Sequence, residues 1–196
     1  MNKAFFRDML TKSVRFHGNL CLGLVLGVRV ALAGLNELKI SHERARDLIV
    51  FTEIDRCLTD AIQAVTGCSL GRRTLKFRDY GKFAATFLDV SSERAVRISI
   101  RPDIPELTLN QNSEMDLESK ISQAVEEYSK IEDNSFLRIE SVKVSMSEYD
   151  LPGRPKSKIS CGSCGERIFD NKGVSAEGRI LCKACSGERY YRSAGE

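Results

Sequence analysis

Apolar and polar positions along the chain predict two helices first and mostly strands afterwards. Apolar side chains recur at helical spacing from Ala4 to Val14, and a nearly continuous apolar stretch from Leu20 to Leu38 predicts a second helix. A break at His17-Gly18-Asn19 separates the two. The second helix carries glycines on a similar face, which predicts close packing against another backbone. These glycines are Gly23, Gly27 and Gly34.

Beyond residue 45 the pattern indicates strands interrupted by two further helices. Arg46 to Glu53 is typical of a buried strand, and Leu58 to Val65 of a helix closed by Gly67. Further strands are expected at 75–77, 82–90, 95–100 and 136–146, an acidic helix at 113–131 and a break at 102–105. Helices followed by locally connected strands predict an α+β fold with an antiparallel or mixed sheet.

The composition changes near residue 151, where the segment LPGRPKSK has the character of a linker. We expect an α+β domain over residues 1–150, a linker over 151–160 and a small module over 161–196. Inside the module, two strand-like pieces at 167–169 and 178–181 precede a segment at 186–191 that can form a helix.

Paired cysteines dominate this module, in the segments CGSC and CKAC. Two residues between cysteines let one tight turn present two thiolates, and four thiolates complete the tetrahedral shell of a structural zinc ion. Because so short a segment buries little core, bound zinc is expected to supply its folding free energy. We therefore predict a treble clef or zinc ribbon rather than four free thiols. The predicted ligands are Cys161, Cys164, Cys182 and Cys185.

A second group of chemically active residues lies in the N-terminal half. His17 and Cys21 are four residues apart, so at a helix start they would face the same way, and an imidazole and a thiolate can share a divalent metal. Cys57 directly precedes the helix expected from Leu58 to Val65, and the positive end of the helix dipole there favours a thiolate. The residues alone leave alternatives open, because Cys21 among Leu and Gly is also typical of core, and His17 could satisfy a turn. His42 lies in a polar stretch and is expected at the surface.

Two sequence blocks carry a family resemblance. FHGNLCLGLVLGVRVA, followed by E-x3-C-x2-DAIQ-x2-TGC-S-x-G and DYGKFAATF, resembles the FmdE family, which is named for a component of molybdenum or tungsten formylmethanofuran dehydrogenase. The resemblance covers most of residues 10–100. It implies an α+β domain, often dimeric, with a metal pocket in which His17, Cys21 and Cys57 match the family's metal-associated residues. It also implies a C-terminal zinc module, and Cys68 matches the cysteine of the TGC block.

The chain departs from the family pattern HGHxCPG at two positions. Asn19 replaces the second histidine and Leu22 the proline. Because an amide oxygen is a poorer zinc ligand than an imidazole, we expect weaker metal binding than in relatives with both histidines. A carboxylate such as Glu53 or Asp60 is expected to orient the His17 ring. Glycines 18 and 23 are expected to let the backbone pass close to the ion.

Composition and charge narrow the class of protein. The chain is 42% hydrophobic and 29% charged, as in globular domains, and no apolar run reaches the about 20 residues of a membrane span. Charges in MNKAFFRDML argue against a signal peptide, so we expect a cytoplasmic protein without membrane contact. In that reducing compartment seven cysteines indicate metal or thiol chemistry rather than disulfides.

The net charge of +3 is unevenly distributed, since nine basic and five acidic side chains from Arg154 onward make this part +4 and the rest −1. This density is modest beside that of dedicated nucleic-acid binders. The basic residues relevant to an anionic partner are Lys156, Lys158, Arg167, Lys172, Arg179, Lys183, Arg189 and Arg192.

Three functions follow as hypotheses. The leading one is a metal-binding accessory protein linked to molybdenum- or tungsten-dependent one-carbon metabolism, whose pocket holds a divalent metal or a metal-bound small molecule. The second is a thiol-dependent enzyme with Cys57 as nucleophile, His17 as base and Asp60 nearby. The third is a nucleic-acid or protein adaptor acting through the basic zinc module. A homodimer is expected, because the helix at 20–38 has more apolar surface than one small domain covers.

Overall fold

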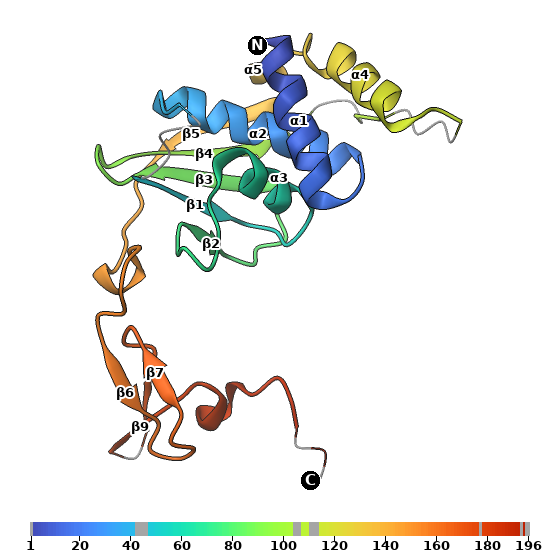
Figure 1. Ribbon diagram of the computed structural model, residues 1–196. Helices are drawn as coiled ribbons and strands as arrows, with labels where there is room; N and C mark the ends of the chain where they lie inside the picture. The colour runs from blue at the N-terminus through green and yellow to red at the C-terminus, as the bar shows by residue number, and fades with distance from the viewer. Residues whose placement is uncertain are drawn as a thin grey trace. The chain divides into compact units, whose positions relative to one another are not determined.

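The computed structural model describes residues 2–41, 47–103, 107–109, 114–176, 178–192 and 194. His42 lies outside this part of the chain, as do residues 104, 105 and 113 at the edges of the expected break and acidic helix. The chain forms two compact units, Met1–Val144 and Ser145–Glu196 (Figure 1). Each is described by itself below. Across the described part, no helix is both long and apolar enough to cross a membrane.

The first unit contains a five-stranded mixed sheet in the spatial order β2-β1-β3-β4-β5. Strands β1 and β2 run parallel and all other neighbours antiparallel. The α+β prediction with a mixed sheet is therefore confirmed. The strands are β1 (Leu48–Thr52), β2 (Leu75–Phe77), β3 (Ala84–Asp89), β4 (Arg94–Ile100) and β5 (Leu137–Val142).

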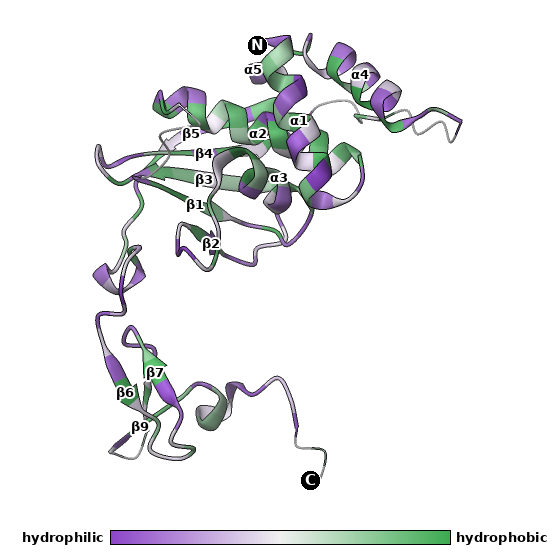
Figure 2. Ribbon diagram, in the orientation of Figure 1, coloured by the Kyte–Doolittle hydropathy of each residue, from purple (hydrophilic) through white to green (hydrophobic). Residues whose placement is uncertain are grey.

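Helices pack on the sheet and share one apolar core with alternate strand residues such as Val50, Phe87 and Ile98. Helix α2 is hydrophobic along most of its length, and twelve of its residues are buried (Figure 2). The helices are α1 (Lys3–His17), α2 (Leu22–Leu38), α3 (Cys57–Thr66), α4 (Leu117–Tyr128) and α5 (Asp133–Phe136).

Local caps set the helix ends. Gly18 has φ 97°, and its N–H donates to the Val14 carbonyl at 2.8 Å, which ends α1 at His17. Cys21 is extended, and its Sγ accepts a hydrogen bond from the Leu24 N–H at 3.3 Å, so α2 begins at Leu22. Of the two residues expected at a helix start, only Cys21 lies there, because His17 ends α1 and the left-handed turn at Gly18, within the predicted break, separates the two.

The glycines of α2 allow the close packing that the sequence predicts. A Cβ at Gly27 would lie 2.7 Å from the Ala61 Cβ of α3, and one at Gly34 would lie 2.5 Å from the Phe87 ring of β3. Most apolar side chains of α2 are buried within the unit, so uncovered surface on this helix does not support a homodimer. Dimerisation stays a prediction that rests on the family resemblance.

A buried arginine in the middle of α2 ties this helix to the segment after α4. Arg29 is 1% exposed. Its guanidinium donates to the carbonyls of Tyr128 and Ile131, the latter at 2.6 Å, and to Asp133 Oδ1 at 2.7 Å. It also lies 4.7 Å from the centre of the Phe136 ring. The charge that interrupts the apolar pattern therefore holds the chain between α4 and β5 against the core.

The second unit is built from two short antiparallel hairpins. A Cβ at Gly173 would overlap the Ile180 side chain and lie 3.2 Å from Ile159, so these side chains pack together with Ile168, and of the three isoleucines only Ile168 is buried. The unit begins with η2 (Glu148–Asp150), and its first strand starts at Lys158. Its other elements are β6 (Lys158–Ser160) paired with β7 (Arg167–Phe169), β8 (Val174–Ala176) paired with β9 (Arg179–Leu181), and the helical turn η3 (Ala184–Glu188).

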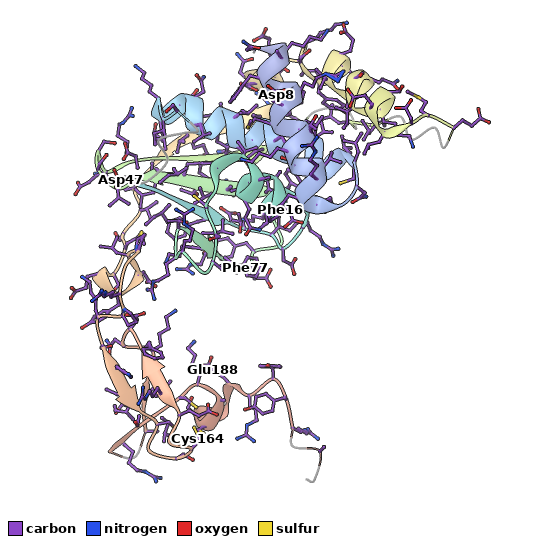
Figure 3. All side chains as sticks on the ribbon, in the orientation of Figure 1. Asp8, Phe16, Asp47, Phe77, Cys164 and Glu188 are labelled. Carbon is purple, nitrogen blue, oxygen red and sulfur yellow. The ribbon has the colours of Figure 1, made fainter. Side chains whose placement is uncertain are left out.

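Most side chains of this unit face solvent. Cys164 and Glu188 are both exposed (Figure 3). Among the described residues from Ser145 onward, only Cys161, Ile168 and Asp170 are buried. Packing alone therefore gives this unit little stability.

Candidate metal sites

Three side chains from three helix ends meet in the first unit. His17 is the last residue of α1, Cys21 caps the start of α2 and Cys57 is the first residue of α3. One ligand atom from each lies within 4.8 Å of the other two, and His17 Nε2 is 3.9 Å from Cys21 Sγ. Ligands of one tetrahedral zinc ion, bound at about 2.0–2.3 Å, lie roughly 3.5–3.8 Å apart. Small side-chain rotations would therefore bring all three to one ion.

Asp60, one turn into α3, fixes the orientation of the His17 ring. Its Oδ2 lies 2.7 Å from His17 Nδ1. An ionised carboxylate only accepts hydrogen bonds, so in a neutral His17 ring this contact favours the tautomer with the proton on Nδ1 and the lone pair on Nε2. That nitrogen is the one near Cys21. Asp60 therefore occupies the orienting position that the sequence predicts.

Glu53, the other carboxylate proposed for that role, is used elsewhere. It is 6% exposed and accepts two hydrogen bonds from Arg97, each 2.7 Å long. This ion pair raises the pKa of Arg97. The Glu53 carbonyl also accepts from the N–H groups of Tyr80 and Lys82. Glu53 thus anchors the segment leading to Cys57 and does not contact His17, so that part of the prediction is wrong.

The two glycines beside the group differ in their surroundings. Nothing lies within 4 Å of a Cβ placed at Gly18, whose role is the left-handed turn. A Cβ at Gly23 would lie 3.3 Å from the Cys57 Cβ and 3.5 Å from its Sγ. Gly23 therefore lets α3 begin close to α2 and makes room for Cys57.

Cys68 and Asn19, the other two positions that the family pattern singles out, have different surroundings from the three candidate ligands. Cys68 is 3% exposed, its thiol donates to the Leu48 carbonyl at 3.6 Å, and burial raises its pKa. It is a core residue and belongs to neither group of potential ligands. Burial, and then the neighbouring Cys57, raise the pKa of the Cys21 thiol. Asn19 is exposed in the turn after α1.

An open cavity of about 430 Å³ adjoins two of the three candidate ligands, His17 and Cys57. Sequence reasoning missed Thr59 of this lining, and it also missed Asp55 and Arg56. Their position directly before Cys57, at the start of a helix expected to carry a ligand, was the signal that could have identified them. The lining residues are His17, Asp55, Arg56, Cys57, Thr59 and Asp60.

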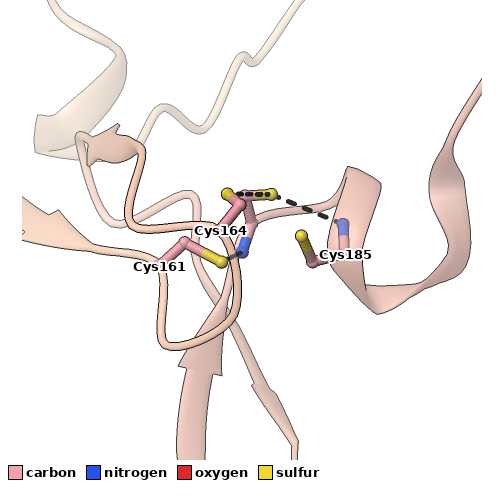
Figure 4. A group of neighbouring side chains, drawn as sticks. Cys161, Cys164 and Cys185 are labelled. Carbon is pink, nitrogen blue, oxygen red and sulfur yellow. Dashed lines mark hydrogen bonds between the residues drawn. The ribbon is translucent and has the colours of Figure 1, made fainter. Parts of the chain in front are cut away.

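The four C-terminal cysteines form the second group. Their sulfurs all lie within 4.8 Å of one another and turn toward a common space, and Cys164 Sγ is 3.9 Å from Cys182 Sγ (Figure 4). Cys161 Sγ accepts from the N–H groups of Ser163 at 3.4 Å and Cys182 at 3.2 Å. The N–H groups of Cys164, Cys182 and Ser163 lower the pKa of Cys161 to about 6. The group has the number, type and spacing of ligands that a zinc module needs.

The fold and the first group define an FmdE domain. The model of the family described as FmdE, molybdenum formylmethanofuran dehydrogenase operon, matches residues 16–138, and the chain belongs to this family. The matched range contains His17, Cys21 and Cys57, and it ends before the four-cysteine module.

Two known proteins are similar to this chain. An FmdE-like protein from Syntrophus aciditrophicus, of the tungsten formylmethanofuran dehydrogenase type, has a crystal structure that matches with a TM-score of 0.59 and 19% identity, over 95% of both chains, which shows a shared fold. A probable S-adenosyl-L-methionine-binding protein from Archaeoglobus fulgidus is 30% identical over 99 residues, which is 48% of this chain and 27% of that protein. The chain thus spans about a quarter of the length of this relative.

Proposed function

We propose that this protein is a metal-binding accessory protein whose pocket holds one divalent ion of the zinc, cobalt or nickel kind. The convergence of His17, Cys21 and Cys57 from three separate helix ends carries the proposal. Two thiolates balance the charge of the ion, and a nitrogen and two sulfurs are ligands that such borderline metals accept. The family supports a link to molybdenum- or tungsten-dependent one-carbon metabolism.

The ligand count favours an exchangeable position at this ion. Three protein ligands leave the fourth tetrahedral position open, as in sites that bind small molecules rather than structural sites. The adjoining cavity gives a ligand access to that position. Asp60 supports His17 as a ligand, since a carboxylate on the far ring nitrogen raises the basicity of the other.

The C-terminal cysteines are proposed to hold a structural zinc ion that folds the second unit. The apolar core there is only a few isoleucines, so metal binding supplies free energy that packing does not. Four thiolates around Zn²⁺ add a charge of −2, which reduces the +4 from Arg154 onward to +2. This small surplus makes a nucleic-acid adaptor the weakest of the three functions.

A second candidate function uses the same side chains. The His17–Asp60 contact of 2.7 Å beside two thiols is also the arrangement of a base that activates a cysteine nucleophile. Thiol alkylation separates the two functions. A metal site predicts that zinc protects Cys57 from iodoacetamide, whereas a catalytic thiol predicts fast, pH-dependent modification of Cys57 that added zinc leaves unchanged.

We further propose a cytoplasmic homodimer. The family resemblance supports the dimer, and seven free thiols suit a reducing compartment. Sedimentation of the full chain at micromolar concentration tests the oligomeric state, and a monomer there contradicts it.

Metal stoichiometry tests the main proposal. The full chain, loaded with excess zinc and then desalted, is expected to keep two ions, and Cys57→Ser only one. Cys68→Ser is the matched control, because it removes a thiol of the same unit that belongs to neither ligand group, and it should keep two. Equal metal content in Cys57→Ser and the unmodified chain would overturn the proposal.

A further inference from the structure

The cavity beside the pocket ligands carries two charges that the metal site does not use. Asp60 is held by His17, but Asp55 and Arg56 are exposed. Within the part of the chain that the structure describes, their side chains make no hydrogen bond or ion pair. Both line the cavity together with the metal ligands His17 and Cys57. A positive and a negative group thus stand free at the open side of the site.

The start of α3 reinforces the positive charge. Arg56 occupies the capping position, and its side chain makes no capping hydrogen bond to the first N–H groups of this helix. Helices α1 and α4 differ, because Asn2 and Asp116 cap them with side-chain oxygens. The Thr59 hydroxyl donates to the Ile54 carbonyl. An anionic group near Arg56 would therefore also meet the positive end of the helix.

Besides Asp55 and Arg56, the metal itself sets a requirement for the molecule that binds here. An ion held by a histidine and two thiolates accepts a further soft ligand in its open position, and a thiolate is such a ligand. A fitting molecule thus carries a thiol, a carboxylate for Arg56 and an ammonium group for Asp55. A cavity of about 430 Å³ lies in the range of small-molecule sites and exceeds what one water requires.

We propose that the pocket binds a small amino acid bearing a thiol, of the cysteine or homocysteine class, through its sulfur on the pocket metal. The inference rests on the proposed function, because the sulfur needs the metal. On binding, the thiol loses its proton to solvent and the sulfur takes the open position. No other covalent bond changes.

A ligand series on the cobalt-loaded full chain tests this inference. The C-terminal group is first filled with zinc, and Co²⁺ is then added so that sulfur-to-cobalt absorption reports the pocket. L-Homocysteine is compared with 3-mercaptopropionate, which lacks the ammonium group, cysteamine, which lacks the carboxylate, and 2-mercaptoethanol, which lacks both. Each charged group is expected to contribute about two- to fivefold in affinity, as exposed ion pairs and helix ends do.

Two variants assign the charges to residues. Arg56→Gln should weaken L-homocysteine and 3-mercaptopropionate about fivefold and leave 2-mercaptoethanol unchanged. Asp55→Asn should weaken L-homocysteine and cysteamine but not 3-mercaptopropionate. Arg72→Gln, at another exposed arginine that does not line the cavity, is the control and should change none of the affinities.

The outcomes separate this inference from the function on which it rests. If cobalt binds in a Cys57-dependent way but all four thiols bind equally, or none changes the spectrum, the amino-acid inference is overturned and the metal site stands. If cobalt binding does not depend on Cys57, the proposed metal site fails as well.

Discussion

Replacing Asp60 by Asn tests how the His17 ring is held for metal binding. The carboxylate lies 2.7 Å from Nδ1, so the variant exchanges a charge-assisted hydrogen bond for a neutral one at nearly constant size. The side chain of His17 is 17% exposed and that of Asp60 38%. The bond is therefore only partly shielded from solvent.

The expected magnitude follows from that exposure. Loss of a carboxylate that orients a metal-bound histidine typically costs 10- to 100-fold in metal affinity. Because solvent screens a side chain that is more than a third exposed, we expect the lower end, about tenfold for the pocket ion, or about 1.4 kcal/mol. The four-cysteine site in the same chain should be unaffected and serves as an internal reference.

The assay is competition for zinc between the full chain and a colorimetric chelator. Asp55→Asn is the matched control, because it removes the same charge from the same cavity without a bond to His17. It should change pocket affinity less than threefold. If both variants weaken the pocket equally, general charge rather than ring orientation is responsible, and the role given to Asp60 is refuted.

Three further predictions concern folding. Cys164→Ser should remove one zinc ion and unfold only the second unit, and calorimetry that shows loss of the main transition would contradict this. Gly27→Ala should destabilise the first unit by about 1–3 kcal/mol in urea denaturation, because the new Cβ would lie 2.7 Å from Ala61; unchanged stability would refute the packing argument. Arg29→Met should cost about 2–4 kcal/mol in the same assay, since it leaves two carbonyls and Asp133 without their donor, and a neutral result would show that the apolar replacement compensates.

The four-cysteine group could be predicted because its ligands are local. Each pair shares one turn, so spacing alone brings its two sulfurs together. The pocket group depends on packing instead. The break at His17-Gly18-Asn19 is predicted, but the sequence does not show that the positive φ of Gly18 turns the chain so that the end of α1 and the start of α2 bring His17 and Cys21 together. Cys57 reaches them only because Gly23 lets α3 start against α2. The residue types were predictable, and their arrangement was not.

Contacts between polar residues that are far apart in the chain could not be predicted from the sequence. Arg29 interrupts an apolar stretch, and the residues around it do not indicate which group it contacts. One partner, the Ile131 carbonyl, lies 102 residues further along the chain. Glu53 was a plausible partner for His17 from its position near Cys57. Its actual partner, Arg97, comes from another strand of the sheet. Helical and strand periodicity describes which face is apolar, but not which distant charge a polar residue meets.

The central claim, one ion shared by His17, Cys21 and Cys57, is tested most directly by X-ray absorption at the cobalt edge. The full chain carries zinc in its C-terminal group and cobalt in the pocket, so the cobalt edge reports the pocket alone. The account predicts one nitrogen at about 2.0 Å, two sulfurs at about 2.3 Å and one further light atom. A shell of oxygen and nitrogen only, or of four sulfurs, would contradict it.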